Sequence, residues 1–244
     1  MMHLYEMIDK RKSFRSYTDV PLEDAVIDRL NRFLAGAKRL YPELPLAWEI
    51  LPRQQVRCIF PWVTPQVIAI YTDDSERAAE NAGFVFQQAD LYLQSLGIGT
   101  CWLGMGRLDG KTTVQDRNNN LRFAMMMAFG TPKKAVWRNG AEDFKRRTLA
   151  EISDTADVRL EPARLAPSSV NSQPWYFVCA EDVIHVYCKQ QGVLKRGALS
   201  EMNRIDMGIA LAHLYVANAE TFRFYHVNEA PSVKGHSYIG SVTL

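Results

Sequence analysis

The sequence has no run of about 18 apolar residues, the length that a membrane-spanning helix requires. Its first residues, Met1 to Glu6, also lack the apolar stretch of a secretory signal. Basic and acidic residues nearly balance, at 29 against 27, so no global field favours nucleic acid or an anionic membrane. We therefore expect a cytoplasmic protein that binds neither nucleic acid nor a membrane.

Cysteine and histidine are both sparse and scattered. The four cysteines show neither the paired short spacing of a zinc site nor the density of a disulfide scaffold. The five histidines form no pair at metal-ligand spacing. We therefore expect reduced thiols and no metal centre, in a chain whose 244 residues and 47% hydrophobic content suffice for a buried core.

Hydrophobic periodicity predicts helices and strands in the first half of the chain. The predicted elements are a helix starting at Pro21, a strand at 67–71, a long helix at about 75–96 and a strand at 123–129. Gly97 would end the long helix as a C-terminal cap. The stretch from Gly36 to Pro65 contains five prolines and reads as irregular.

The same order of elements restarts at about residue 157. The predicted elements are a helix ending near Ala166, strands at 175–179 and 183–188, a helix at about 204–219 and a strand at 222–227. Asn81–Phe86 aligns with Asp206–Leu211 at an offset of 125 residues, and Phe33–Lys38 aligns with Arg164–Ser169 in the same order. Two matches with similar offsets favour a diverged duplication. We predict a first half at 1–135, a connecting segment at 136–156 and a second half at 157–244.

Two basic stretches are candidates for binding a phosphate. In the first, Arg11 to Tyr17, guanidinium groups and a serine hydroxyl fall close together beside a helix end, as a phosphate dianion requires. The second is the basic tripeptide at 145–147, which lies in a long polar connection that we expect to wrap across the molecule. Taken alone, the first stretch is at least as well explained as the solvated basic end of a helix, and the second is better explained as solvated surface.

Two further loops could bind a flat ring. The stretch 165–177 contains Pro167, Ser168, Ser169 and Asn171, and its hydroxyl and amide groups match the polar edge of a heteroaromatic ring. The alternative is an ordinary turn built from proline, serine and asparagine. The stretch 97–104 is rich in glycine, which would let the backbone approach a planar ligand, although helix-ending glycines are common.

Together these strings resemble the nitroreductase family. The resemblance rests on Arg-x-Ser-x-Arg near the start, Pro-Ser-Ser-Val-Asn-Ser-Gln-Pro-Trp at 167–175, Gly-x-Gly-Thr-Cys-Trp-x-Gly after a long helix, Phe-Gly-x-Pro after a strand, and a basic run before Leu-x-Glu. It implies an α+β nitroreductase-like fold, internally duplicated, with mixed sheets flanked by helices. It also implies flavin mononucleotide (FMN) as cofactor and NADH or NADPH as electron donor.

The sequence departs from the ordinary family pattern in a complementary way. In ordinary members the serine and asparagine string soon follows Arg-x-Ser-x-Arg, and a homodimer holds two FMN sites at its interface. Here the first half has Gly36–Pro42 in place of that string, while the second half has the string without an Arg-x-Ser-x-Arg or a glycine loop. The pattern is similar to a fused pseudo-dimer with one flavin per chain, either a monomer or a weak homodimer.

The resemblance also implies roles for individual residues. Arg11, Lys12, Ser13 and Arg15 would form the phosphate site, helped by Arg146 or Arg147. The residues expected beside the flavin ring and ribityl chain are Pro167, Ser168, Ser169 and Asn171, with backbone groups of Ile98 and Gly99 approaching the ring. No catalytic side chain is expected, because the flavin carries the chemistry.

The function implied is ping-pong reduction of a nitroaromatic, a quinone or a similar electron-poor small molecule. Two alternatives remain open. One is a protein that stores or senses flavin without turnover, and the other keeps the fold without the cofactor. Retention of both parts of the site argues against the latter.

Overall fold

The central helix of the fold is α3, Glu76–Ser95, and both of its ends are set by local sequence. The computed structural model describes residues 2–58, 64–110, 121–190 and 198–244. Ser75 caps the start of α3 by accepting a hydrogen bond from the Ala78 amide. Gly97, at a φ of +79°, ends it, with the Ile98 amide donating to the Leu93 carbonyl. The predicted helix and its glycine cap are confirmed.

The first half of the chain forms a four-stranded antiparallel sheet in the order β1-β3-β6-β4. Its strands are β1 (Leu46–Pro52), β3 (Gln66–Thr72), β4 (Gly99–Leu103) and β6 (Arg122–Gly130). The helices of this half are α1 (Met2–Tyr5), α2 (Asp24–Gly36) and α3. Every residue of β3 is buried, which explains its uninterrupted apolar run.

The second half forms another four-stranded antiparallel sheet in the order β7-β8-β10-β9. Its strands are β7 (Trp175–Cys179), β8 (Ile184–Lys189), β9 (Arg223–Tyr225) and β10 (His236–Thr243). The helices are α5 (Glu161–Arg164) and the long α6 (Ala198–Ala217). When the strands are numbered within each four-stranded sheet, both sheets have the same order, first, second, fourth, third. Each long helix likewise falls between the second and third strands of its sheet.

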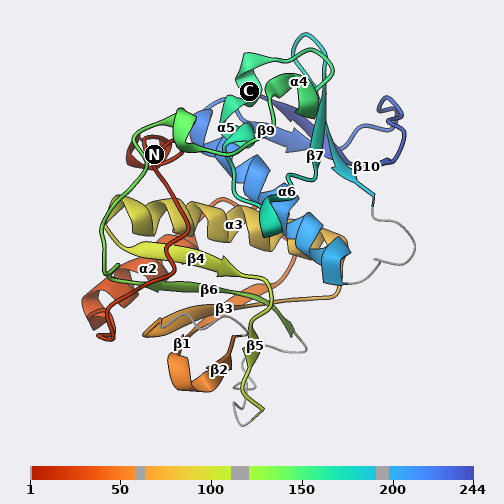
Figure 1. Ribbon diagram of the computed structural model, residues 1–244. Coiled ribbons are helices and arrows are strands. Elements are labelled where there is room, and N and C mark those ends of the chain that lie inside the picture. Colours follow the sequence, from red (N-terminus) through yellow and green to blue (C-terminus); the bar gives the residue numbers. More distant parts are fainter. Residues whose placement is uncertain (1, 59–63, 111–120, 191–197) are drawn as a thin grey trace.

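Smaller elements complete the fold. They are η1 (Arg53–Gln55), the paired strands β2 (Val56–Arg57) and β5 (Arg107–Leu108), η3 (Ala141–Asp143), α4 (Leu149–Ile152), η4 (Val158–Leu160) and η5 (Ser169–Asn171). The connection between the halves therefore contains short helical turns, and Figure 1 shows it running along one side of the molecule, from the lower sheet to the upper one.

Helices α3 and α6 cross in the middle of the molecule, between the two sheets (Figure 1). A Cβ on Gly83 would lie 2.0 Å from the Ile205 carbonyl oxygen, and a Cβ on Gly208 would lie 1.9 Å from the Glu80 oxygen. The two contacts are reciprocal, because the 125-residue offset relates Gly83 to Gly208 and Glu80 to Ile205. This pattern matches a two-fold interface between like subunits.

The observed fold is α+β, as predicted. Its ladders between described strands are antiparallel, and parallel pairing is confined to isolated bridges such as Ser13 with Thr100. Helix α2 starts at Asp24, so the helix start predicted at Pro21 was wrong. The irregular stretch from Gly36 to Pro65 contains β1, and the predicted glycine loop is largely β4. In the described parts of the chain, no helix combines the length and apolarity needed to cross a bilayer.

The glycine crossing yields a stability prediction. Gly83→Ala and Gly208→Ala would each force a methyl group into a backbone oxygen of the facing helix, so each should destabilise the protein by about 1–3 kcal/mol. Urea unfolding followed by circular dichroism measures this. Gly36→Ala is the matched control in a helix, because its Cβ would meet no atom within 4 Å. Unchanged midpoints for the two crossing variants would contradict the proposed close contact.

Candidate cofactor site

A cavity of about 410 Å³ lies between residues of the two halves. From the first half it is lined by Ser13, Arg15, Cys58, Met125 and the stretch Cys101–Met105. From the second half it is lined by Pro167–Val170 and by Leu199, Met202, Ile205, Asp206 and Ile209, most of them on α6. The Arg-x-Ser-x-Arg segment and the Pro-Ser-Ser loop, about 150 positions apart in the sequence, therefore face one space.

The N-terminal segment reaches the cavity by pairing with β4. Ser13 forms a parallel bridge with Thr100, and the Phe14 amide donates to the Thr100 carbonyl at 2.8 Å. A Cβ on Gly99 would lie 2.8 Å from Cγ of Phe14, so the glycine lets the phenyl ring pack directly on the strand. This packing holds Ser13 and Arg15 at the cavity.

The loop of the second half is anchored from α6. Both carboxylate oxygens of Asp206 accept from the Ser169 amide at 3.0 Å, and the Ser168 hydroxyl accepts from the Gln173 amide at 2.9 Å. Burial raises the pKa of the Asp206 carboxyl well above its ordinary value.

The same loop holds a strained backbone. Val170 has a φ of +48° and is 92% exposed, a conformation that a β-branched residue rarely adopts. Asn171 and Gln173 also have positive φ. Such strain persists where the surroundings impose it and often marks a functional loop.

A basic cluster lies beside the loop. Arg146 donates to the Ala166 carbonyl at 2.9 Å and to the Asn171 side-chain oxygen at 2.6 Å. Burial, together with the nearby charges of Arg11, Arg138 and Arg164, lowers the pKa of Arg146 to about 10. Burial and the charges of Arg11 and Arg15 lower the pKa of Arg138 to about 10 as well. The cluster carries unfavourable like charge that a bound anion would offset.

Several residues proposed from the sequence lie away from the cavity lining. Arg11 is 1% exposed and paired with Asp90, and Lys12 lies over the Phe14 ring. Ile98 packs in the core and Gly99 contacts Phe14. Their direct contact with a cofactor stays a prediction.

The structure also separates the neighbouring arginines of the basic tripeptide. Arg147 donates to the Gln173 carbonyl at 3.2 Å, and its amide donates to the Gln173 side-chain oxygen, whereas Arg146 belongs to the basic cluster. Gln173 therefore holds the loop together. Asn171 is exposed and bonded to Arg146 and to the Lys145 carbonyl.

Sequence reasoning missed the residues that form the walls of the cavity. Trp102 and Met105 come from the end of β4 and the turn after it, a few positions beyond the predicted Ile98 and Gly99. Met202 comes from the first turns of α6, and Arg138 joins the basic cluster from the connection. The glycine-rich string at 97–104 was the available signal for Trp102 and Met105. The sequence pointed to the start of this string, at Ile98 and Gly99, whereas its end lines the cavity.

A tyrosine ring is buried on the other side of the α3–α6 crossing. Asn81, equivalent to Asp206, accepts from the Leu40 and Tyr41 amides at 3.0 and 3.2 Å. The Tyr41 ring, 5% exposed, then packs edge-on against Phe224, and its hydroxyl donates to Glu80 at 2.9 Å. The helix positions related by the 125-residue offset thus each hold a loop, and on this side the loop carries a buried tyrosine ring.

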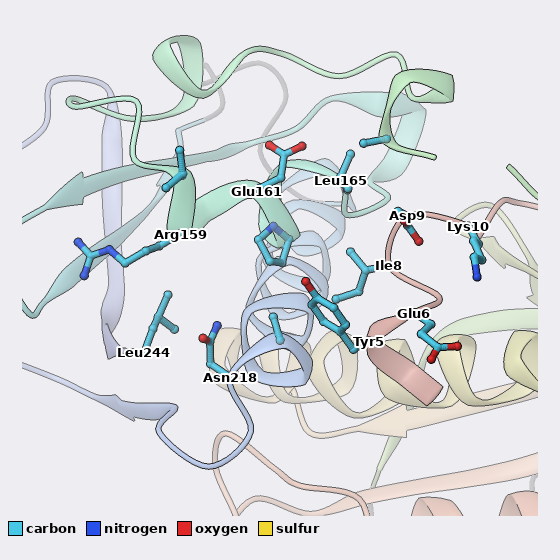
Figure 2. A pocket seen from close by; sticks show the side chains of 14 residues that line it. Tyr5, Glu6, Ile8, Asp9, Lys10, Arg159, Glu161, Leu165, Asn218 and Leu244 are labelled. Carbon is cyan, nitrogen blue, oxygen red and sulfur yellow. The ribbon is translucent and has the colours of Figure 1, made fainter. Parts of the chain in front are cut away.

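A larger cavity of about 610 Å³ has a different character. Figure 2 shows Asp9 and Lys10 of the N-terminal segment on one side of it, and Arg159 and Leu244 on the other. Arg159, which lines this cavity, is ion-paired with Asp157 at 2.6 Å, and Glu6, Asp9 and Glu161 add negative charge to the lining. This cavity is poorly suited to a phosphate. Across the described residues, no group of histidine, cysteine and acidic side chains could hold a metal ion, and all four cysteines are free.

Comparison with known proteins places the chain in a family. The model of the family described as "Putative TM nitroreductase" matches residues 3–218. The chain belongs to this nitroreductase family. Membership makes it an oxidoreductase that acts on small molecules, in agreement with the resemblance of its motifs. No curated protein matches the sequence.

A solved structure that spans nearly the whole chain agrees with the fold. A putative nitroreductase from Thermotoga maritima MSB8 covers 99% of this chain and 92% of its own, with a TM-score of 0.66 and 20% identity. For a nitroreductase family protein from Clostridium difficile 630, the match covers 61% of this chain and 95% of that protein, with a TM-score of 0.49 and 16% identity. For an FMN-dependent nitroreductase from Clostridium difficile R20291, the match covers 59% of this chain and 98% of that protein, with a TM-score of 0.46 and 17% identity.

The basic cluster predicts a difference between adjacent arginines. Inorganic phosphate should raise the melting temperature of the wild-type apoprotein more than chloride does at equal ionic strength. Arg146→Met should weaken phosphate binding about tenfold, the effect of removing one positive charge near the anion. Arg147→Met is the control and should bind phosphate like the wild type, because its guanidinium contacts Gln173. Equal losses in the two variants would refute this assignment.

Proposed function

We propose that the 410 Å³ cavity holds one FMN, contacted by both halves of the chain. Ser13 and Arg15 would bind the phosphate, in the field of Arg138 and Arg146. The observation that carries the proposal is that the two motifs resembling opposite sides of a nitroreductase interface line one cavity.

The chemistry of the cavity fits a flavin nucleotide. Its volume lies within the range of cofactor sites, and its walls are mainly apolar, with polar groups at a few points. Met125, Met202 and Ile205 offer the apolar surface that a flat ring needs, while the Ser168 and Ser169 hydroxyls and nearby backbone groups suit its polar edge. The lowered pKa values of Arg138 and Arg146 mark a cation cluster that a phosphate dianion would stabilise.

We also propose that the chain is an internally duplicated pseudo-dimer with one FMN per chain. The identical strand orders and the reciprocal glycine contacts support the duplication. In this proposal the buried Tyr41 ring fills the equivalent second site on the other side of the crossing, so that side would hold no flavin.

The activity that follows is reduction of a nitroaromatic, a quinone or a similar electron-poor acceptor with NADH or NADPH. When bound there, FMN would supply the hydride and electron transfer between the nicotinamide and the acceptor. The chain itself would orient the ring between β4 and the Pro167–Val170 loop and exclude water with Trp102, Met125 and Met202. Because both substrates would use one face in turn, the kinetics should be ping-pong.

The purified protein should contain about one FMN per chain and be yellow. Anaerobic NADH or NADPH should bleach the flavin band, and initial-rate lines with menadione as acceptor should run parallel. Intersecting lines would refute the ping-pong order. A yellow protein that neither bleaches nor turns over would indicate flavin storage or sensing, and a protein that binds no flavin would refute the cofactor assignment.

A further inference from the structure

One face of α3 is polar although it is buried. Gln87, Asp90 and Gln94 recur at helical spacing and are at most 2% exposed. Burying polar groups is costly unless each finds a hydrogen-bond partner. These three side chains therefore depend on a specific network, which the proposed cofactor contacts do not account for.

Asp90 is the centre of this network. Its Oδ2 lies 2.9 Å from Arg11 Nε and accepts from Gln87 Nε2 at 2.8 Å. Its Oδ1 accepts from Gln94 Nε2 at 3.2 Å and from the Thr100 hydroxyl. Oδ1 thus accepts two hydrogen bonds, which is its full capacity, while Oδ2 accepts one and forms an ion pair with Arg11 Nε, whose geometry is not that of a hydrogen bond. The pair with Arg11 is a fully buried ion pair, whose loss would leave an uncompensated charge.

Two routes lead from Asp90 to the cavity. Along the first, Arg11 Nη2 donates to the Ser13 hydroxyl at 3.5 Å, and the Arg11 carbonyl accepts from Arg138. Gln94 reinforces this route, because its side chain bonds both the amide and the carbonyl of Lys12 at 3.1 Å. The network thereby sets the position of the segment that presents Ser13.

Along the second route, Gln87 reaches the cavity wall. Its Oε1 accepts from Trp102 Nε1 at 3.0 Å, and Trp102 lines the cavity. Its Nε2 also contacts His213 Nε2 at 3.1 Å, while His213 Nδ1 lies 2.9 Å from the Pro162 carbonyl. A carbonyl only accepts, so Nδ1 carries the proton and Nε2 accepts from Gln87. The network therefore joins α3 of the first half to α6 of the second.

We infer that Asp90 is a positioning residue of the cofactor site: through Arg11 it fixes Ser13 at the phosphate end, and through Gln87 it fixes Trp102 at the wall. This inference rests on the proposed function. It opposes the simplest electrostatic expectation, in which removing a carboxylate near a basic cluster would strengthen anion binding. The two accounts predict changes of opposite sign.

The test is the ratio of FMN to riboflavin affinity, which reports the contribution of the phosphate. Both dissociation constants are measured on the full-length apoprotein by flavin fluorescence titration. Asp90→Asn keeps the shape but turns one acceptor into a donor, which leaves a buried donor such as Arg11 without its partner. We expect the ratio to fall about tenfold. An unchanged or raised ratio would overturn the inference.

The matched control is Glu80→Gln. Glu80 is also a buried carboxylate of α3, 2% exposed and paired with an arginine, Arg204, at 2.8 Å, but it lies beside the filled second site. It should lower stability without changing the ratio. A fall of the same size in both variants would mean a general loss of structure and would also overturn the inference.

Thr100→Val decides the matter if Asp90→Asn fails to fold. It removes one donor to Asp90 with no change of charge or volume, and we expect a fall of about threefold in the ratio. An unchanged ratio in folded Thr100→Val would count against Asp90. If the wild type binds neither flavin, the proposed function fails instead, so the two failures are distinguishable.

Discussion

The close crossing of α3 and α6 is the constraint on which the rest of the structure depends. Gly83 and Gly208 leave no side chain between the two backbones, so the helices approach until each glycine faces a carbonyl oxygen of the other. This approach brings the loop after α5 within reach of β4 and the N-terminal segment. The cavity is then a consequence of the crossing, because its walls come from both sides of it.

On both sides of the α3–α6 crossing, a side chain of the long helix accepts hydrogen bonds from the backbone amides of a loop, but the two loops differ in what they carry. Asn81 and Asp206 each hold a loop by its backbone amides. On one side that loop carries small hydroxyl residues and leaves a cavity, while on the other it carries Tyr41, whose ring fills the space. In our account the chain keeps the architecture of a dimer and specialises one of its two interfaces for a cofactor.

The sequence predicted what depends on local pattern. The strand at 67–71, the helix at 75–96 and its cap at Gly97 follow from periodicity and turn chemistry, and all three are observed. The strand β1 was missed because prolines surround it, and its pairing with β3 is long-range. The network around Asp90 was missed because its links to Arg11, Lys12 and His213 join residues far apart in sequence. A polar stripe at helical spacing on a buried helix was the available signal.

The central claim is that one FMN contacts both halves of one chain. A crystal structure of the FMN complex tests it most directly. The account predicts a single flavin per chain, with Ser13 or Arg15 within hydrogen-bond distance of its phosphate and the Ser168–Ser169 loop of the same chain against its ring or ribityl chain. A flavin held by one half alone, or one shared between two chains, would contradict it.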